Sequence, residues 1–139
     1  MDMITTKHVT GLFILLLGLT ARAFSQDLEE QVFYPSGRLE HTRYSIGDKI
    51  FFIAYHENGR VKEIGAFRQG RPEGEWKQFT ESGRLTVRAN FRDGRLQGTS
   101  EFHDPFDRWS GRLVHEQGVL RRGEQRDGQG YLVAQRDYR

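Results

Sequence analysis

Histidine is the side chain of this sequence best suited to metal or acid–base chemistry, because the chain contains no cysteine. Four histidines lie beyond residue 25: His41, His56, His103 and His115. Their spacings do not match the close ligand pairs of a zinc site, and no thiolate is present to complete one. We therefore expect solvated histidines on strands or loops, with no metal centre and no cofactor.

His103 and Asp104, close to Trp109, form the best polar and aromatic cluster for catalysis. A small secreted hydrolase that uses His103 and nearby acids is accordingly one hypothesis. The sequence has neither a Gly-x-Ser-x-Gly elbow nor a phosphate-cradling glycine loop before a helix. We expect no catalytic residues and favour a protein that is not an enzyme.

Four arginines follow a glycine in the same local pattern: Arg38, Arg60, Arg84 and Arg112. If their segments stack, the arginines line up along one edge and could form a track for phosphate, a lipid headgroup or an acidic peptide. Alternatively, they pair with the nearby carboxylates of Glu40, Glu57, Glu63 and Glu81. Beyond residue 25 the chain has 19 basic and 18 acidic residues, a formal net charge of +1, which favours simple pairing and gives no support for a nucleic-acid partner.

Aromatic side chains are the other candidates for recognition. Most of them should hold neighbouring segments together, and each ring that is fully buried contributes about 1.5–3 kcal/mol. A sheet of one layer nevertheless leaves part of its aromatic surface uncovered. We predict partner-binding roles for Trp76, Phe106, Trp109, Arg60 and Arg84, and we expect Trp76→Ala to weaken partner binding more than stability.

The elements that would position these residues are repeated. The segment Tyr55–Phe79 is followed by Phe79–Phe102, and four positions of the first recur in the second at one constant offset: Gly59 at Gly83, Phe67 at Phe91, Gly70 at Gly94 and Gly74 at Gly98. Internal periods of roughly 20–50 residues are typical of repeat proteins. In the second copy Leu85, Val87, Ala89 and Phe91 alternate with polar residues, as in a half-buried strand.

Glycines at the ends of the expected strands indicate hairpin turns, since tight hairpins require positive φ. We place turns at Gly37, Gly59, Gly70, Gly83, Gly94 and Gly111, and we expect Gly37, Gly59, Gly83 and Gly111 to follow one rim. The sequence thus predicts an all-β fold, an elongated single-sheet antiparallel meander of about four stacked β-hairpin repeats. The approximate repeats are 33–54, 55–78, 79–102 and 103–133, the last with an insertion over 104–110.

Residues 1–25 have the pattern of a signal peptide, which would be helical. Lys7 and His8 precede the apolar run Leu12–Leu19, and small residues allow cleavage after Ala23 or Ser25. Residues 26–32 look like a polar lead-in, the repeat domain covers 33–133, and 134–139 form a tail that frays. Export to the periplasm, the outer envelope or the medium is therefore expected.

The repeated pattern aromatic-x-x-x-Gly-Arg-Leu, aromatic-x-x-Gly-x-x-x-Gly-x-Trp-x-x-aromatic resembles the MORN repeat, and more closely its bacterial variant, over about Phe33 to Tyr131. The third module departs from it at Ser100 and His103, which stand where Trp76 and Phe79 stand in the second. The resemblance implies a protein-binding or scaffold module whose partner is another protein, with a membrane surface as a weaker alternative. It also implies a second hypothesis, an antitoxin-like inhibitor that masks a toxic partner. Partner identity and oligomeric state stay open.

Overall fold

A computed structural model describes residues 26–139 of the chain. The expected signal peptide, residues 1–25, lies outside the described residues. The described part contains strands and no helix, so no element in it is a helix that could cross a membrane.

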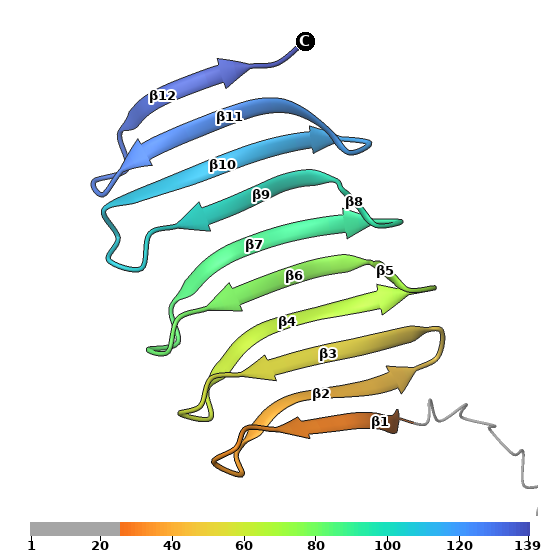
Figure 1. The fold of residues 1–139 in the computed structure, drawn as a ribbon. Helices are drawn as coiled ribbons and strands as arrows, with labels where there is room; N and C mark the ends of the chain where they lie inside the picture. Colours follow the sequence, from red (N-terminus) through yellow and green to blue (C-terminus); the bar gives the residue numbers. More distant parts are fainter. Residues whose placement is uncertain (1–25) are drawn as a thin grey trace, which may run out of the picture.

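Twelve antiparallel strands form one open sheet, as the repeats predicted (Figure 1). Ten of them follow one another across the sheet in chain order, while β5 pairs only with β4 and β8 only with β7. The strands are β1 Gln26–Phe33, β2 Leu39–Ile46, β3 Lys49–Tyr55, β4 Val61–Arg68, β5 Arg71–Pro72, β6 Gly74–Phe79, β7 Leu85–Arg92, β8 Arg95–Leu96, β9 Gly98–His103, β10 Trp109–Glu116, β11 Val119–Asp127 and β12 Leu132–Asp137.

The connections lie on two rims of the sheet (Figure 1). The loop rim carries the five-residue loops 34–38, 56–60, 80–84, 104–108 and 127–131. The turn rim carries the two-residue turns 47–48, 69–70, 93–94 and 117–118. In the last three turns both residues have positive φ, for example 51° at Asp93 and 79° at Gly94, which is the geometry of the type I′ hairpin turn.

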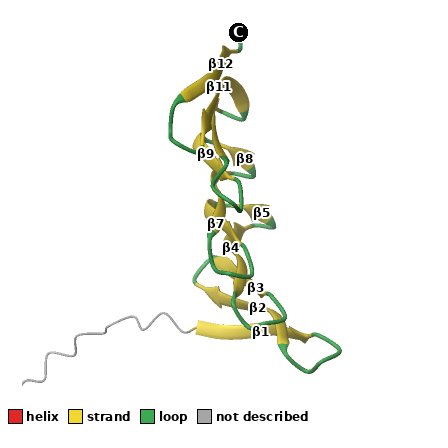
Figure 2. Ribbon diagram, turned by 90° about the vertical axis from the view of Figure 1, so that its left-hand side faces the viewer, coloured by secondary structure: helices red, strands yellow, loops and turns green. Residues whose placement is uncertain are grey.

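No second layer covers either face of the described sheet, and the view from the loop rim shows a thin, twisted ribbon (Figure 2). The interior is correspondingly small, since Ala66 and Ala89 are the only apolar residues of the described chain that are buried. Side chains on a sheet alternate between faces. The strand register therefore places Phe52, Trp76, Ala89, Ser100 and Leu113 in one row along a single face.

The opposite face changes character along the sheet. Near the N-terminal strands it is apolar, and Tyr44 stacks on Phe51 with ring centroids 5.4 Å apart. Farther along, the face carries ion pairs. Those between strands join Arg88 to Glu75 and Glu101, and Arg112 to Glu101, while Lys77 pairs with Glu75 and Arg126 with Glu124 along a single strand. Long charged side chains thus cover the sheet where apolar residues are scarce.

Both ends of the sheet differ from the sequence-based boundaries. Residues 26–32 are part of strand β1 rather than a lead-in, and β12 extends to Asp137 rather than fraying from residue 134. Each of these strands pairs with one neighbour only, through β1–β2 and β11–β12. The polar composition of β1 is that of an edge strand, which has to stay soluble, and it hid this strand from a search for apolar alternation.

The predicted insertion at residues 104–110 is also wrong. The loops of the loop rim begin at Tyr34, His56, Thr80, Asp104 and Asp127, so the step from the third loop to the fourth equals the step from the second to the third. Asp107, with φ of 56°, takes the place that glycine takes in the other loops. Gly111 is therefore no turn glycine and lies inside β10, whereas Gly37, Gly59, Gly70, Gly83 and Gly94 have positive φ at turns.

Candidate functional site

The loops of the loop rim share one hydrogen-bonding scheme. In the first three, the N–H of the first residue donates to the carbonyl of the fifth, and the fourth donates back to the first, as Gly59 does to His56 at 2.8 Å. The first residue also reaches the next hairpin: Tyr34 Oη donates to the Tyr55 carbonyl at 2.7 Å, and His56 Nε2 to the Phe79 carbonyl at 2.8 Å. His56 is therefore committed to a structural bond between hairpins.

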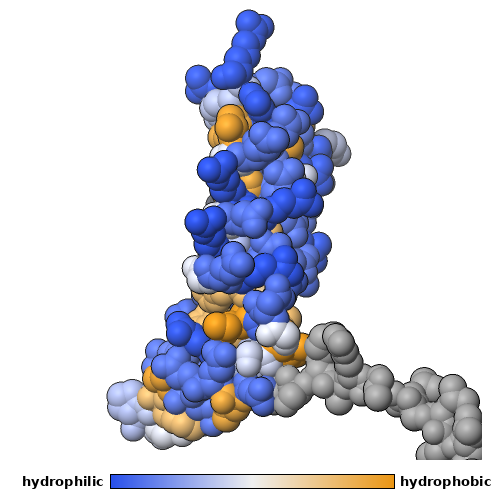
Figure 3. All heavy atoms as spheres, turned by 90° about the vertical axis from the view of Figure 1, so that its right-hand side faces the viewer, coloured by the Kyte–Doolittle hydropathy of each residue, from blue (hydrophilic) through white to orange (hydrophobic). Residues whose placement is uncertain are grey.

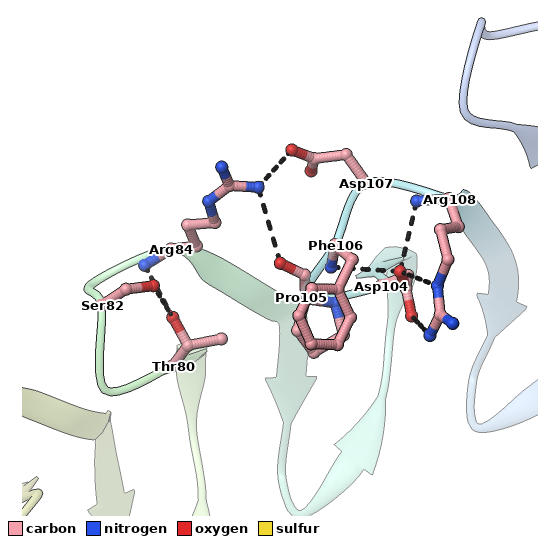
Figure 4. Close-up of polar contacts among 8 residues, drawn as sticks. All are labelled: Thr80, Ser82, Arg84, Asp104, Pro105, Phe106, Asp107 and Arg108. Atoms are coloured by element: carbon pink, nitrogen blue, oxygen red, sulfur yellow. Dashed lines mark hydrogen bonds and ion pairs between the residues drawn. The ribbon is translucent and has the colours of Figure 1, made fainter.

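The arginines that end these loops connect each loop to the next. Arg38 Nη1 donates to the Glu57 carbonyl at 2.6 Å and Arg60 Nη1 to the Glu81 carbonyl at 3.2 Å. Arg84 reaches the Pro105 carbonyl at 3.5 Å and pairs with the Asp107 carboxylate (Figure 4). The first two arginines thus bind backbone oxygens, where pairing with carboxylates was expected.

Arg112 does not belong to this series. It lies inside β10 and pairs with Glu101 at 3.5 Å, while Arg108 is the arginine of the fourth loop. The sequence Gly-Arg-Leu at 111–113 matches the motif of the earlier loops, but it lies within β10, after the fourth loop at 104–108.

Asp104 organises the fourth loop (Figure 4). Its side chain is only 4% exposed, and its carboxylate accepts hydrogen bonds from the Phe106 N–H at 3.0 Å, the Arg108 N–H at 3.2 Å, and Arg108 Nε and Nη2 at 2.8 Å each. The Arg108 side chain, helped by the two backbone donors, lowers the pKa of Asp104 far below its ordinary value. Asp104 is therefore a fixed anion that shapes the loop and has no proton to give to a reaction.

His103 lies apart from this carboxylate in a small pocket of about 80 Å³ with Glu101, Ser110, Arg112, Glu124 and Arg126. His103 and Ser110 are partners across β9 and β10. Both glutamates of the pocket already pair with arginines, Glu101 with Arg112 and Glu124 with Arg126. Within residues 26–139, no hydrogen bond joins His103 to the serine or to an acid, so the pocket lacks the linked nucleophile and base of a hydrolase.

The other histidines do not assemble a metal site in the described chain, where no group of three metal-ligating side chains occurs. His41 packs against the Phe52 ring with centroids 5.5 Å apart and lies 3.7 Å from Glu30. His115 is buried on the same face of β10 as Leu113, two residues farther along the strand.

Trp76 lies in the middle of an aromatic cluster. Its ring is 5.2 Å from that of Phe67, 6.2 Å from Phe91 and 6.4 Å from Phe52 between centroids, and its Nε1 donates to the Ala66 carbonyl at 3.3 Å. The indole covers Gly65 so closely that a Cβ there would overlap it. These contacts favour a structural role for Trp76.

Phe106 and Trp109 are, by contrast, open to solvent. Phe106 is 74% exposed at the tip of the fourth loop and Trp109 is 42% exposed at the start of β10. The next loop lies against this one, because a Cβ on Gly128 would come within 3.4 Å of Arg108 Cα. It adds Tyr131, which is 70% exposed, and β12 begins directly after it with Leu132 and Val133, which are 48% and 62% exposed. We call Phe106, Trp109, Tyr131, Leu132 and Val133 the C-terminal rim patch.

The sequence predicted the turns at Gly70 and Gly94, but sequence reasoning missed the pocket that lies on the turn rim. Here the Gly94 N–H donates to the Pro72 carbonyl at 3.0 Å and the Gly118 N–H to the Leu96 carbonyl at 3.1 Å, so neighbouring turns are joined as on the loop rim. A pocket lies between them, lined by Arg71, Arg92, Asp93, Arg95, Gln97 and Gln117. The recurrence of Arg71 at Arg95, one repeat later, is the signal that could have drawn attention to it.

Comparison of the chain with protein-family models and with curated proteins finds no match in either case.

Proposed function

We propose that this protein is a non-enzymatic repeat protein, a variant of the MORN type, that binds another protein through the C-terminal rim patch. The repeated hairpins, joined loop to loop along both rims, supply a stiff scaffold. The leader-like pattern of residues 1–25 supports a place in the cell envelope as part of the same proposal.

The observation that carries the proposal is the exposure of large apolar side chains on and directly after the two adjacent loops at the C-terminal end of the loop rim. Phe106 and Tyr131 come from two adjacent loops, and Trp109 is the first residue of β10, just after the first of them; the three are 74%, 70% and 42% exposed. Aromatic side chains are enriched among the residues that dominate binding energy at protein interfaces. The guanidinium carbon of Arg108 lies 5.2 Å from the centre of the Phe106 ring, so a charged group borders the apolar surface, as at the rim of an interface.

The test is capture of partners by the full chain from envelope extract, compared among three forms of the protein. The double variant Phe106→Ala and Trp109→Ala should lose the captured partner by tenfold or more, since hot-spot residues contribute about 2 kcal/mol or more each. Val119→Ala is the matched control, because Val119 is 50% exposed but lies on the turn rim.

Unchanged capture by the double variant, or equal loss in the control, contradicts this use of the patch. The envelope location has its own test in cell fractionation. Protein found only in the cytoplasm with residues 1–25 intact contradicts it, and leaves the antitoxin-like alternative in place.

A further inference from the structure

The arginines of the described chain fall into two groups by their partners. Most donate to a carboxylate or a carbonyl or lie over an aromatic ring, as Arg60, Arg122 and Arg136 do. Four described arginines have no side-chain partner: Arg71, Arg92, Arg95 and the C-terminal Arg139. Three of these four line the same pocket of the turn rim.

The geometry of this pocket concentrates positive charge. Arg92 and Arg95 face each other directly across β7 and β8. Like charges in that position repel, and no acid of the described chain pairs with either arginine to offset the repulsion. Asp93 is the single carboxylate in the lining, so three guanidinium groups leave an excess of two positive charges.

Two of the arginines are held at their stems by the neighbouring turn. A Cβ on Gly94 would lie 3.3 Å from Arg71 Cβ, and one on Gly118 would lie 3.3 Å from Arg95 Cβ. The turns that carry these glycines are fixed in turn by side chains, since Glu73 Oε2 accepts from the Asp93 N–H and Gln97 Oε1 from the Gln117 N–H, both at 2.8 Å. The pocket is therefore assembled by the repeat itself.

We propose that the turn-rim pocket binds a phosphate-type dianion, either free phosphate or the phosphate group of a soluble monoester. Guanidinium groups match phosphate oxygens with paired hydrogen bonds, and the carboxamides of Gln97 and Gln117 add neutral donors. The pocket volume of about 510 Å³ is within the usual range for small-molecule sites. In the view onto this rim the middle of the sheet is mostly hydrophilic, and apolar colour lies toward the N-terminal strands and near the C-terminal end (Figure 3). This site is separate from the C-terminal rim patch and does not depend on it.

The experiment is a titration of the full chain, followed by calorimetry and by amide NMR shifts, at constant ionic strength. Inorganic phosphate, glycerol 3-phosphate and glycerol are the three probes. Saturable binding of phosphate alone identifies the free anion, binding of both phosphates identifies the monoester, and glycerol should not bind. Arg95→Gln should weaken binding about tenfold, as expected for loss of a hydrogen bond to a charged group. Asp93→Asn should strengthen it, because the one repelling carboxylate is gone.

Arg60→Gln is the matched control, since it removes the same charge on the opposite rim. Equal weakening in Arg60→Gln, or the absence of saturable phosphate binding, overturns the proposal. Folding is monitored by melting temperature. Without phosphate, Arg95→Gln should melt no lower than the wild type because the repulsion with Arg92 is relieved. Added phosphate should raise the melting temperature of the wild type and of Arg60→Gln more than that of Arg95→Gln.

Discussion

Replacement of Gly65 by alanine is the sharpest test of how this single-layer sheet holds itself together. The Trp76 indole lies directly on Gly65, so an added methyl group has to displace the ring. The displaced ring would lose its contacts with Phe67 and Phe91 and its hydrogen bond to the Ala66 carbonyl. Overpacking of this kind costs about 1–3 kcal/mol.

Gly111→Ala is the matched control. Both glycines lie inside strands and neither has a positive φ, but a Cβ at Gly111 would meet its nearest atoms only at 3.7 Å, which is ordinary contact. Alanine in such a place leaves stability unchanged or raises it by about 0.4–1 kcal/mol, because the unfolded chain loses freedom.

The assay is thermal unfolding followed by circular dichroism. Gly65→Ala should lower the melting temperature by several degrees, at roughly 2–8 °C for each kcal/mol in a domain of this size. Near-ultraviolet circular dichroism should change as well, because the indole moves. Trp76→Phe places a smaller ring over Gly65. In that background the loss of unfolding free energy caused by Gly65→Ala should fall by half or more. A double-mutant cycle measures this coupling.

Equal melting temperatures for Gly65→Ala and Gly111→Ala would refute this account of the cluster. So would a cost of Gly65→Ala that stays the same in the Trp76→Phe background. Either result would mean that the ring does not rest on the glycine as the structure has it.

Three further predictions concern single side chains. Trp76→Ala should cost about 3 kcal/mol of stability and leave partner capture intact, the reverse of the expectation from sequence, because the ring packs in the cluster. Arg60→Gln should lower the free energy of unfolding, measured by chemical denaturation, by about 0.5–1.5 kcal/mol, because the hydrogen bond to the Glu81 carbonyl is lost. Lys62→Gln is the control and should not change it measurably, since the Lys62 side chain has no partner in the described chain. Asp104→Asn should lower the melting temperature at neutral pH. Because the folded pKa of Asp104 lies below its ordinary 3.8, its stabilisation is complete above that pH and fades below it, so the difference from wild type should narrow in acid.

The central repeats could be predicted from sequence because local signals agree there. Alternation over Leu85–Phe91 and the glycines at 59, 83 and 94 point to the same hairpins that the structure has. The ends of the sheet could not be found in this way. A strand such as Gln26–Phe33 is held by backbone pairing with β2, and its polar side chains carry no alternation that a pattern search can detect.

The fourth repeat shows a different limit. Matching letters aligned Gly-Arg-Leu at 111–113 with the earlier turns, but the chain turns at Asp104–Arg108. Aspartate can adopt positive φ, as Asp107 does, and the Asp104 carboxylate supplies hydrogen bonds that the loop needs. The constant spacing of the central repeats was the better guide, since stacked hairpins have to keep a common length whatever residues form their turns.

The same residue type has different uses on the two rims because the register gives it different neighbours. On the loop rim, Arg38 and Arg60 follow a glycine and extend toward the next loop, where a backbone carbonyl meets each guanidinium. On the turn rim, Arg71 and Arg95 come directly after a two-residue turn, and the next turn offers a glycine against their stems and no acceptor at their ends within the described chain. The repeat thus gives hydrogen-bond partners to the arginines of the loop rim and none to those of the turn rim. Only the turn rim therefore has guanidinium groups free to bind a ligand. Replacing an arginine of the loop rim should accordingly lower the free energy of unfolding measured with denaturant. Replacing one of the turn rim should instead weaken the binding of added anions.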